Sequence, residues 1–305
     1  MNPAEAFVTR LCTRSFLSLW SYPNPRGKGL AKELCDILVV CDPDILVFSV
    51  KDIIPKQTTN PALGYKRWRK RAIKDSVKQI YGAERWIGSA EHAITRDGKP
   101  TLPFPPIATR RIHRVAVALG SKGKFPVEWG DFGKGFVHVF DKTSLHIVMG
   151  ELDTISDFVK YLSDKELLYR NGVSTAFAAG EEDLLALYLH RGRQFPDGYD
   201  HIVLDDNLWA AVSTKPEFRA KKLADRDSYA WDKLIEGFTR DLQTGNIEFG
   251  KGLPDAEKAL RIMARENRFS RRVLGKAFKK FIELSRQRKI RSRRVPADLV
   301  WYTFF

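Results

Sequence analysis

Two apolar runs near the start of the chain form its clearest pattern. Residues 33–41 and 45–51 are dominated by Ile, Val, Leu and Phe, and the Asp-Pro-Asp at 42–44 between them is typical of a turn. This pattern predicts two β-strands joined into a hairpin. Because successive side chains of a strand point to opposite faces, Asp36 on the first strand and Lys51 on the second are expected to meet at one end of the sheet.

Helical periodicity lies on both sides of this hairpin. Apolar residues recur every three or four positions in residues 4–20 and again in residues 65–87, which predicts two helices. A further strand is expected at residues 111–119. A second hairpin, turning around Asp141–Ser144, is expected to pair residues 136–140 with residues 145–149. Loops are expected at residues 22–29 and 88–110.

From about residue 150 onward the pattern becomes mainly helical. Thr154 and Asp157 resemble a capping box, and the acidic residues 181–183 are typical of the first turn of another helix. Helical patterns fill roughly residues 215–286 with a break near 245–254, and strands are expected within 200–213 and at 299–305. The chain is therefore expected to be an α/β (α+β) protein. Residues 1–150 would form a mixed sheet flanked by helices, and residues 151–305 a mainly helical, basic second domain.

The charge of the chain narrows the class of partner. The 305 residues have a net charge of +15, and the pI is about 9.7, which favours nucleic acid, with acidic lipid or protein as alternatives. Cys12, Cys35 and Cys41 lie in apolar runs without Cys-x-x-Cys spacing, which indicates buried thiols in a reducing cytoplasm. No leader is recognised and no apolar run approaches ~18 residues. A soluble cytoplasmic protein without a membrane partner is expected.

Two clusters of Lys and Arg are candidates for contact with nucleic acid. The helix predicted at 65–87 has a cationic face that either is simply solvated or contacts phosphates. Residues 265–294 contain thirteen Lys or Arg against two Glu, which favours a surface that follows a nucleic-acid backbone. The residues expected to bind nucleic acid are Arg67, Lys70, Arg71, Lys74, Arg271, Arg272, Lys276, Lys279, Lys280, Arg288 and Lys289.

The order of elements around the first hairpin resembles that of the PD-(D/E)XK nuclease superfamily. A helix with Glu5, a strand opening on Asp36, a strand ending on Ser49-Val50-Lys51 and a second helix follow one another within residues 1 to about 120. The resemblance implies a restriction-endonuclease-like core of a helix, a β-meander, a second helix and a further strand. It also implies that Glu5, Asp36 and the Val50 carbonyl hold Mg²⁺ or Mn²⁺, and that Lys51 assists the attacking water. Hard oxygen ligands suit these ions, which activate water and the phosphoryl group.

Ser49 stands where the family has its second acid. Serine is a poor Mg²⁺ ligand and brings no charge, so a two-acid site needs another carboxylate. Glu33 at the strand entrance is the nearest candidate, whereas Asp52 points to the wrong face. Gln79 has the position of a glutamine used by some members, but Tyr81 follows at two residues rather than four, so that submotif is not assigned. The candidate catalytic residues are Glu5, Glu33, Asp36, Ser49 and Lys51.

Each of these residues also has an ordinary structural interpretation. Glu5 can be a first-turn acid favoured by the helix dipole, Asp36 can cap a strand entry, and Lys51 can end a strand at solvent. The sequence lacks a P-loop, a Gly-x-Ser-x-Gly elbow and a His-x-x-x-His pair, which argues against those enzyme classes and a zinc site.

Three functions follow from the resemblance and the charge. The first is a metal-dependent nuclease that cuts DNA rather than RNA, from an end or internally, in bacterial restriction or anti-phage defence. The second is the same fold with a decayed site that holds nucleic acid without cutting it. The third is a subunit completed by a partner protein or by further copies of itself.

Overall fold

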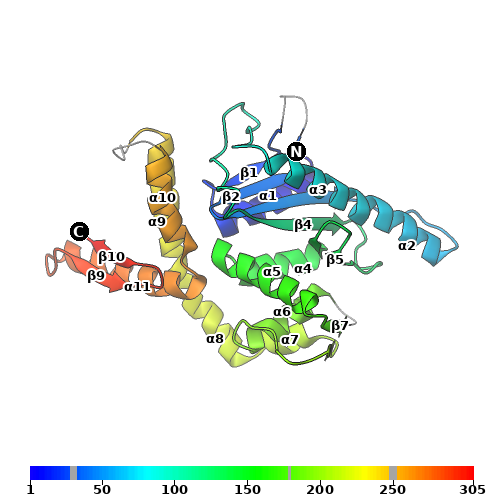
Figure 1. Ribbon diagram of the computed structural model, residues 1–305. Coiled ribbons are helices and arrows are strands. Elements are labelled where there is room, and N and C mark those ends of the chain that lie inside the picture. The colour runs from blue at the N-terminus through cyan, green and yellow to red at the C-terminus, as the bar shows by residue number, and fades with distance from the viewer. Residues whose placement is uncertain (28–32, 178–179, 247–252) are drawn as a thin grey trace.

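A six-stranded mixed β-sheet forms the centre of the molecule (Figure 1). The computed structural model describes residues 1–27, 33–177, 180–246 and 253–305. The strand order is β1-β2-β3-β4-β6-β5; β3, β4 and β6 run parallel, and the other neighbours are antiparallel. The strands are β1 (Ser21–Pro23), β2 (Ile37–Cys41), β3 (Asp44–Asp52), β4 (Arg111–Leu119), β5 (Gly130–Asp131) and β6 (Phe136–Phe140). The predicted α/β class is confirmed.

The predicted first hairpin is confirmed as β2–β3. Ile37 lies opposite Phe48, and Cys41 lies opposite Asp44. The turn contains a cis peptide bond between Asp42 and Pro43. The expectation of a loop at 22–29 is wrong at its start, because Tyr22 and Pro23 belong to β1, which pairs with β2 at the edge of the sheet. Residues 28 and 29 of that loop lie outside the described residues.

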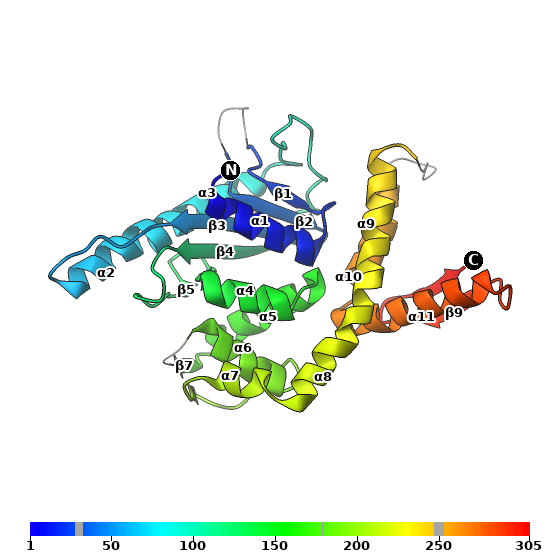
Figure 2. The ribbon, with the colours of Figure 1, turned by 180° about the vertical axis from the view of Figure 1, so that it is seen from behind.

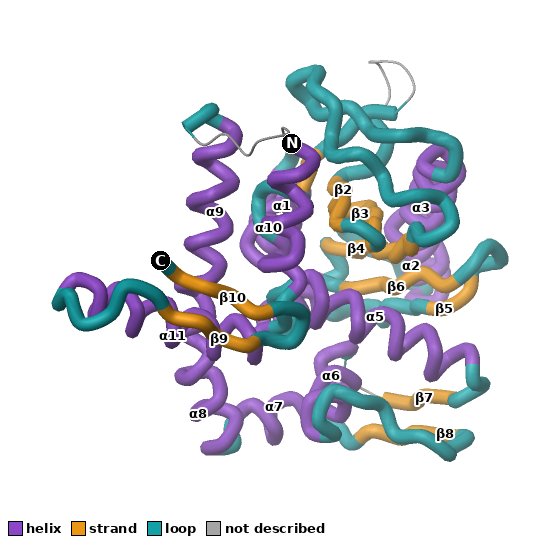
Figure 3. The backbone as a smooth tube through the Cα atoms, turned by 60° about the vertical axis from the view of Figure 1, so that its left-hand side comes forward, coloured by secondary structure: helices purple, strands orange, loops and turns teal. Residues whose placement is uncertain are grey.

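Helices cover both faces of this sheet. α1 (Pro3–Phe16) lies on one face and α3 (Asp75–Ile87) on the other, as the edge-on view of the strands shows (Figure 3). α2 (Pro61–Arg69) continues into α3 through a π-turn at Lys70–Lys74, so the helix predicted at 65–87 consists of three parts. The structure therefore has the order helix, three-stranded meander, helix, strand.

The expectation of a second hairpin is wrong at residues 145–149. They form part of α4 (Lys142–Glu151), which packs on the α1 face, where Ser15 Oγ donates to the Met149 carbonyl at 3.2 Å. The Asp141 side chain accepts a hydrogen bond from the Ser144 N–H at 2.8 Å, and Ser144 Oγ accepts one from the Asp141 N–H. Residues 141–144 are thus the capping box of a helix rather than a β-turn.

The second half of the chain is mainly helical, as predicted. The Thr154 hydroxyl caps α5 by accepting a hydrogen bond from the Asp157 N–H at 3.1 Å. Two small strand pairs accompany the helices: β7 pairs in parallel with β8, and β9 pairs antiparallel with β10, which confirms the strand expected near the C-terminal aromatic run. The elements are α5 (Ile155–Arg170), β7 (Ser174–Phe177), α6 (Glu181–His190), β8 (His201–Leu204), α7 (Leu208–Ser213), α8 (Pro216–Asp225), α9 (Tyr229–Gln243), α10 (Leu253–Arg265), α11 (Arg268–Arg286), β9 (Arg293–Pro296) and β10 (Trp301–Phe304).

The C-terminal helices pack against the turn end of the β2–β3 hairpin (Figure 2). Trp20 Nε1 donates to Glu257 Oε1 of α10 at 2.9 Å, and Arg261 and Arg265 of α10 form ion pairs with Asp42 and Asp44. One hydrophobic core contains buried residues from both halves. The domain boundary near residue 150 stays a prediction. None of the described helices is long and apolar enough to cross a bilayer.

Candidate active site at the open end of the hairpin

Asp36 and Lys51 lie together at the end of the hairpin away from the turn. Asp36 precedes β2 and is buried, with 5% of its surface exposed. One of its carboxylate oxygens, Oδ2, accepts a hydrogen bond from the Val50 N–H at 2.5 Å and lies 4.0 Å from Lys51 Nζ. Strand alternation therefore predicted the meeting of these two residues correctly.

Gln79 of α3 connects Lys51 to Ser49. Its Oε1 atom accepts hydrogen bonds from Ser49 Oγ and from Lys51 Nζ, each at 2.9 Å. Ser49 is fully buried, whereas the Lys51 side chain is 30% exposed. One amide oxygen thus fixes the direction of the lysine, and Ser49 supports that amide instead of supplying a carboxylate. The sequence indicated the position of Gln79 but not this contact.

Asn24 connects the other two candidate acids. Its Nδ2 atom donates to Glu33 Oε1 at 3.1 Å and lies 3.5 Å from Glu5 Oε2. Glu5 also completes the capping box of α1 with Asn2. Its structural role is therefore present, and its carboxylate is linked to the site only through Asn24. Asn24 was missed in the sequence, although Asn-Pro in a turn-rich segment is a weak signal for a special backbone position.

Asn24 itself adopts an unusual conformation and has an unused oxygen. Its φ angle is +47°, in the left-handed region that asparagine tolerates better than most residues. Its N–H donates to the Asp36 carbonyl at 2.8 Å, which joins the backbones of the two residues. Its Oδ1 atom is buried and has no hydrogen-bond partner among the described residues. A buried amide oxygen without a donor is a candidate ligand for a cation.

The surroundings of Asp36 shift its proton equilibrium toward neutral pH. Burial, with a smaller contribution from the neighbouring Glu33 carboxylate, raises the pKa of Asp36 to about 6, against the lowering by the Val50 N–H and the Lys51 charge. A perturbed carboxyl group beside a lysine in a cleft is a common property of functional sites. Asp36 therefore loses its proton closer to neutral pH than an ordinary aspartate does.

The donor atoms at this end suit a hard divalent cation. In the described ranges no three His, Cys, Asp or Glu side chains are grouped closely enough to hold a metal by themselves. The available oxygens are the carboxylates of Asp36 and Glu33, the Asn24 amide oxygen and the Val50 carbonyl. This mixture of carboxylate and neutral oxygens is of the kind that binds Mg²⁺ or Mn²⁺ with several water molecules retained.

A groove opens directly beside these residues. It has a volume of about 620 Å³, and its walls include Glu33 and Gln79 from the site together with Lys78, Arg85 and Trp86 of α3. Two cations and an indole ring offer phosphate and base contacts next to the carboxylates. The groove therefore joins Glu33 and Gln79 of the candidate site to the surface of α3.

The two cationic clusters predicted to bind nucleic acid differ in their pairing. Arg67, Lys70, Arg71 and Lys74 are exposed, and within the described residues none of them lies within 4 Å of a carboxylate. Figure 1 shows that α2 and α11 project from opposite sides of the molecule. The two clusters therefore cannot form one continuous surface around the candidate site.

Arg271, which was expected to bind nucleic acid, is buried in the protein. Arg271 is 1% exposed and pairs with Asp232 of α9 at 2.7 Å. Buried acids on neighbouring elements therefore neutralise part of this cationic run.

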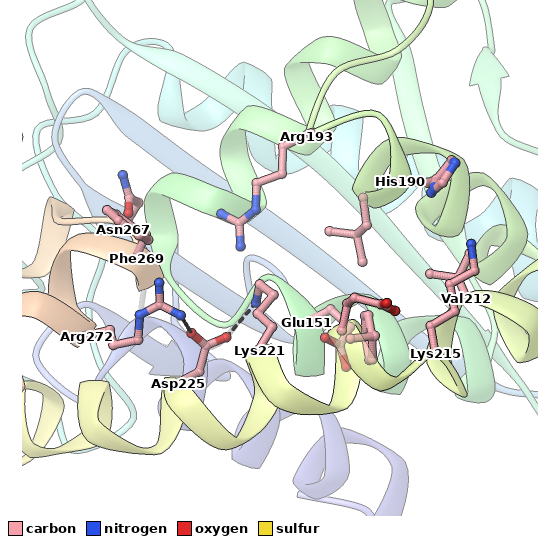
Figure 4. Close-up of a pocket in the computed structure, with 14 residues that line it drawn as sticks. Glu151, His190, Arg193, Val212, Lys215, Lys221, Asp225, Asn267, Phe269 and Arg272 are labelled. Carbon is pink, nitrogen blue, oxygen red and sulfur yellow. Dashed lines mark hydrogen bonds and ion pairs between the residues drawn. The ribbon is translucent and has the colours of Figure 1, made fainter.

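The exposed cations of α11 are partly neutralised as well. Lys276 and Lys279 both pair with Asp227, at 3.8 and 2.8 Å, and Lys280 pairs with Glu283. Arg272 pairs with Asp225, as does Lys221, in a cavity of about 600 Å³ between α6, α8 and α11 (Figure 4). Arg288 and Lys289 are exposed beyond the end of α11.

Comparison with known proteins adds no relative. No family model, curated protein or solved structure matches this chain. The resemblance to PD-(D/E)XK nucleases therefore depends on the residues and the order of elements described above.

Proposed function

We propose that this protein is a metal-dependent nuclease that hydrolyses phosphodiester bonds, in DNA rather than in RNA. The observation that carries the proposal is the convergence of Asp36 and Lys51 with Gln79, which lines a groove that also has Lys78 and Arg85 in its walls. A buried carboxylate with few hydrogen-bond donors, such as Asp36, is costly to maintain, and such groups are common at functional sites.

Metal binding falls to the oxygen atoms around Asp36. Asp36 and Glu33 would supply the charge, and the Asn24 amide oxygen would supply the neutral ligand that now lacks a donor. A bound Mg²⁺ or Mn²⁺ supplies Lewis-acid polarisation of the phosphoryl group and a more acidic water. Glu33 takes the place that Ser49 leaves vacant as the second acid.

Lys51 acts on the phosphate side of the reaction. Its ammonium group, held by Gln79 Oε1, is 4.0 Å from Asp36 and can donate to an oxygen of the phosphoryl group as negative charge develops there. Gln79 is a positioning residue that limits the freedom of Lys51. Ser49 positions Gln79 in turn.

The biological setting belongs to the proposal through the family resemblance. It includes a cytoplasmic location, a role in restriction or anti-phage defence, and a partner subunit or further copies that complete the assembly. The net charge of +15 supports a polyanionic substrate.

The test is a cleavage assay with matched lysine variants. Purified protein is incubated with plasmid, linear DNA and RNA in Mg²⁺, in Mn²⁺ and in EDTA, beside Lys51→Ala and Lys99→Ala. Lys99 is an 80%-exposed surface lysine outside the candidate site. We expect metal-dependent cutting of DNA that Lys51→Ala abolishes and Lys99→Ala retains. Equal cutting by both variants would refute the role of Lys51.

A second candidate function is nucleic-acid binding without cleavage. Ser49 favours it, because this buried hydroxyl is already hydrogen-bonded to Gln79 and offers no charge to a metal. Binding to DNA in every buffer, without cutting in any, would support this alternative over the nuclease.

A further inference from the structure

A second cavity lies along α2, beyond the candidate site. It has a volume of about 510 Å³ and opens between the segment after β3 and the α2–π-turn region. Trp68 Nε1 donates to the Ile53 carbonyl at 3.0 Å and joins the two walls. At Gly64 an added Cβ atom would come within 2.9 Å of the Thr58 methyl group. This hydrogen bond and the close packing at Gly64 therefore hold the two walls together.

Four cations surround this cavity without a counter-charge. Lys56, Arg67, Lys70 and Arg71 all line it. Across the described parts of the chain, none of the four is within 4 Å of a carboxylate oxygen. The only acid in the wall, Asp75, faces Lys78 at 3.7 Å. Like charges gathered in one concave surface repel each other unless an anion is bound between them.

The cavity between α6, α8 and α11 shows the opposite arrangement. Its cations Lys221 and Arg272 share Asp225 (Figure 4), and Arg193 is paired with Asp157. Most of the cations around that cavity thus have an acid partner, and the four around the α2 cavity have none within 4 Å among the described residues.

A π-turn forms part of the wall of the α2 cavity. The Asp75 N–H donates to the Lys70 carbonyl, five residues earlier, instead of to that of Arg71. This extra residue in the turn brings Lys70 into line with Asp75, while Arg71 remains on the same wall. π-turns inside α-helices are often found at functional sites.

The α2 cavity lies on the same stretch of helix as the candidate site. Gln79 follows Asp75 by one helical turn, and Arg71 is about 12 Å from Gln79 along the axis at 1.5 Å per residue. Phosphates of one DNA strand recur about every 3.4 Å along the duplex axis. A duplex that lies parallel to α3 with its scissile phosphate at the candidate site would therefore present its third or fourth neighbouring phosphate to this cavity.

We infer that Lys56, Arg67, Lys70 and Arg71 form a binding site for a non-scissile backbone phosphate of the nucleic-acid substrate. This inference rests on the proposed function and identifies the surface that holds the substrate strand. The negative charge of the phosphate offsets part of the repulsion among the four cations, and Ile54, which is 75% exposed at the rim, contacts the sugar.

The first experiment measures binding in EDTA, where no cleavage occurs. Fluorescence anisotropy with a 16-base-pair duplex compares wild type, Arg67→Gln/Arg71→Gln and the control Lys99→Gln/Lys258→Gln. The control removes the same charge from exposed lysines that are paired with Asp97 and Asp255 and lie outside both cationic clusters. We expect the first variant to bind about tenfold or more weakly, with the salt slope reduced by about 1–2. The control should stay within about twofold to threefold of wild type. Equal loss in both variants would refute a specific site.

Two further measurements identify the anion. Replacing the duplex with its uncharged methylphosphonate analogue should weaken wild type strongly and the Arg67→Gln/Arg71→Gln variant much less. An equal loss in both proteins would contradict phosphate recognition here. Inorganic phosphate should compete only at far higher concentration than DNA; equal competition would show a site for a free small anion instead and would overturn the inference.

Cleavage kinetics separate this inference from the proposed function. If wild type cuts DNA, Arg67→Gln/Arg71→Gln should raise KM and leave kcat unchanged, because the cations are remote from the reacting bond. If wild type never cuts but the differences in EDTA appear, the nuclease proposal fails and the phosphate site stands. If the wild type cuts DNA and the Arg67→Gln/Arg71→Gln variant has unchanged KM and unchanged binding, the nuclease proposal stands and the phosphate site is refuted.

Discussion

The two ends of the β2–β3 hairpin each contain a buried aspartate, and the two carboxylates have opposite surroundings. At the turn end, Asp44 accepts hydrogen bonds from Arg111 at 2.8 Å, from Arg265 at 2.5 Å and contacts the His113 ring at 2.9 Å. Burial alone would raise the pKa of Asp44, but the hydrogen bonds of His113 and Arg111 and the nearby charges hold it well below its ordinary value.

At the open end, Asp36 has far fewer donors. It has the Val50 N–H and a single lysine at 4.0 Å, and its pKa is raised to about 6 because burial outweighs both. Burial alone therefore does not identify a carboxylate with a purely structural role. Such a carboxylate is one whose oxygens all have hydrogen-bond donors. Asp44 is complete without a ligand, whereas Asp36 retains capacity for one.

The largest expected effect is the loss of charge at the turn end. Asp44→Asn leaves Arg265 and Arg111 without their shared anion, and we expect a loss of about 3–5 kcal/mol in the free energy of unfolding. Denaturant titration at pH 7.5 measures it. The same isosteric change at the other end, Asp36→Asn, is the control and should cost nothing. Comparable losses of stability in both variants would contradict the proposed difference between Asp44 and Asp36.

The pH dependence of stability should have opposite signs at the two ends. The pKa of Asp44 is lowered, so its contribution to stability is present above the ordinary aspartate pKa of 3.8 and is lost as the pH falls through the lower pKa of the folded state. The pKa of Asp36 is raised, so its contribution is present below 3.8 and is lost as the pH rises through about 6.

As the pH rises from 4 to 8, the free energy of unfolding of Asp36→Asn should therefore increase relative to that of wild type by about 2–3 kcal/mol. Unfolding curves of both proteins across this pH range measure the gain. A constant difference over the whole range would mean that Asp36 titrates normally.

A bound metal ion should supply Asp36 with the partner that it lacks at the open end of the hairpin. Mn²⁺ at ten times its dissociation constant should stabilise wild type by about 1.4 kcal/mol at pH 8. The effect should vanish in Asp36→Asn and weaken below pH 6, where protons compete for Asp36. Thermal unfolding with and without Mn²⁺ provides the measurement.

Ser49→Asp sharpens the metal test. Restoring an acid beside Asp36 should lower the Mn²⁺ concentration at half effect, while the added buried charge destabilises the metal-free protein. Lack of any Mn²⁺ response in both wild type and Ser49→Asp would count against a metal site at this end.

The smallest expected effect is at Gln79. Gln79→Leu removes the acceptor for Ser49 Oγ and Lys51 Nζ and should cost about 1 kcal/mol, since a buried hydroxyl is left unsatisfied. Gln79→Glu keeps an acceptor and should retain stability in denaturant titration. A Leu variant as stable as wild type would show that Ser49 finds another partner.

Local pattern was enough to predict some elements and not others. The β2–β3 hairpin was predictable because β-branched runs flank turn residues. Residues 145–149 were not, because Leu-His-Ile-Val-Met fits a strand as well as a helix, and only the Asp141–Ser144 capping box decides between them. The three-residue edge strand β1 is held by pairing with β2, which its own sequence does not indicate.

The candidate site divides in the same way. Asp36 and Lys51 follow from strand alternation, which is a local property. The contacts of Gln79 and Asn24 depend on how α3 and the segment before β2 fold back over the strands, which no single periodicity encodes. Arg271 was assigned wrongly because a run of like charges does not show that Asp232, on another helix, is its partner.

The ion pairs at the hairpin turn have a consequence for how the chain is made. Asp44 and Arg265 are separated by 221 residues, and Trp20 and Glu257 by 237. At ribosomal rates of about 5–20 residues per second, Asp44 waits on the order of 10–45 s for Arg265 to emerge. Until residues 257–265 have left the ribosome, the nascent sheet exposes the Trp20 indole N–H and an incompletely paired Asp44. During this interval the nascent sheet exposes the largest surface to which a chaperone could bind.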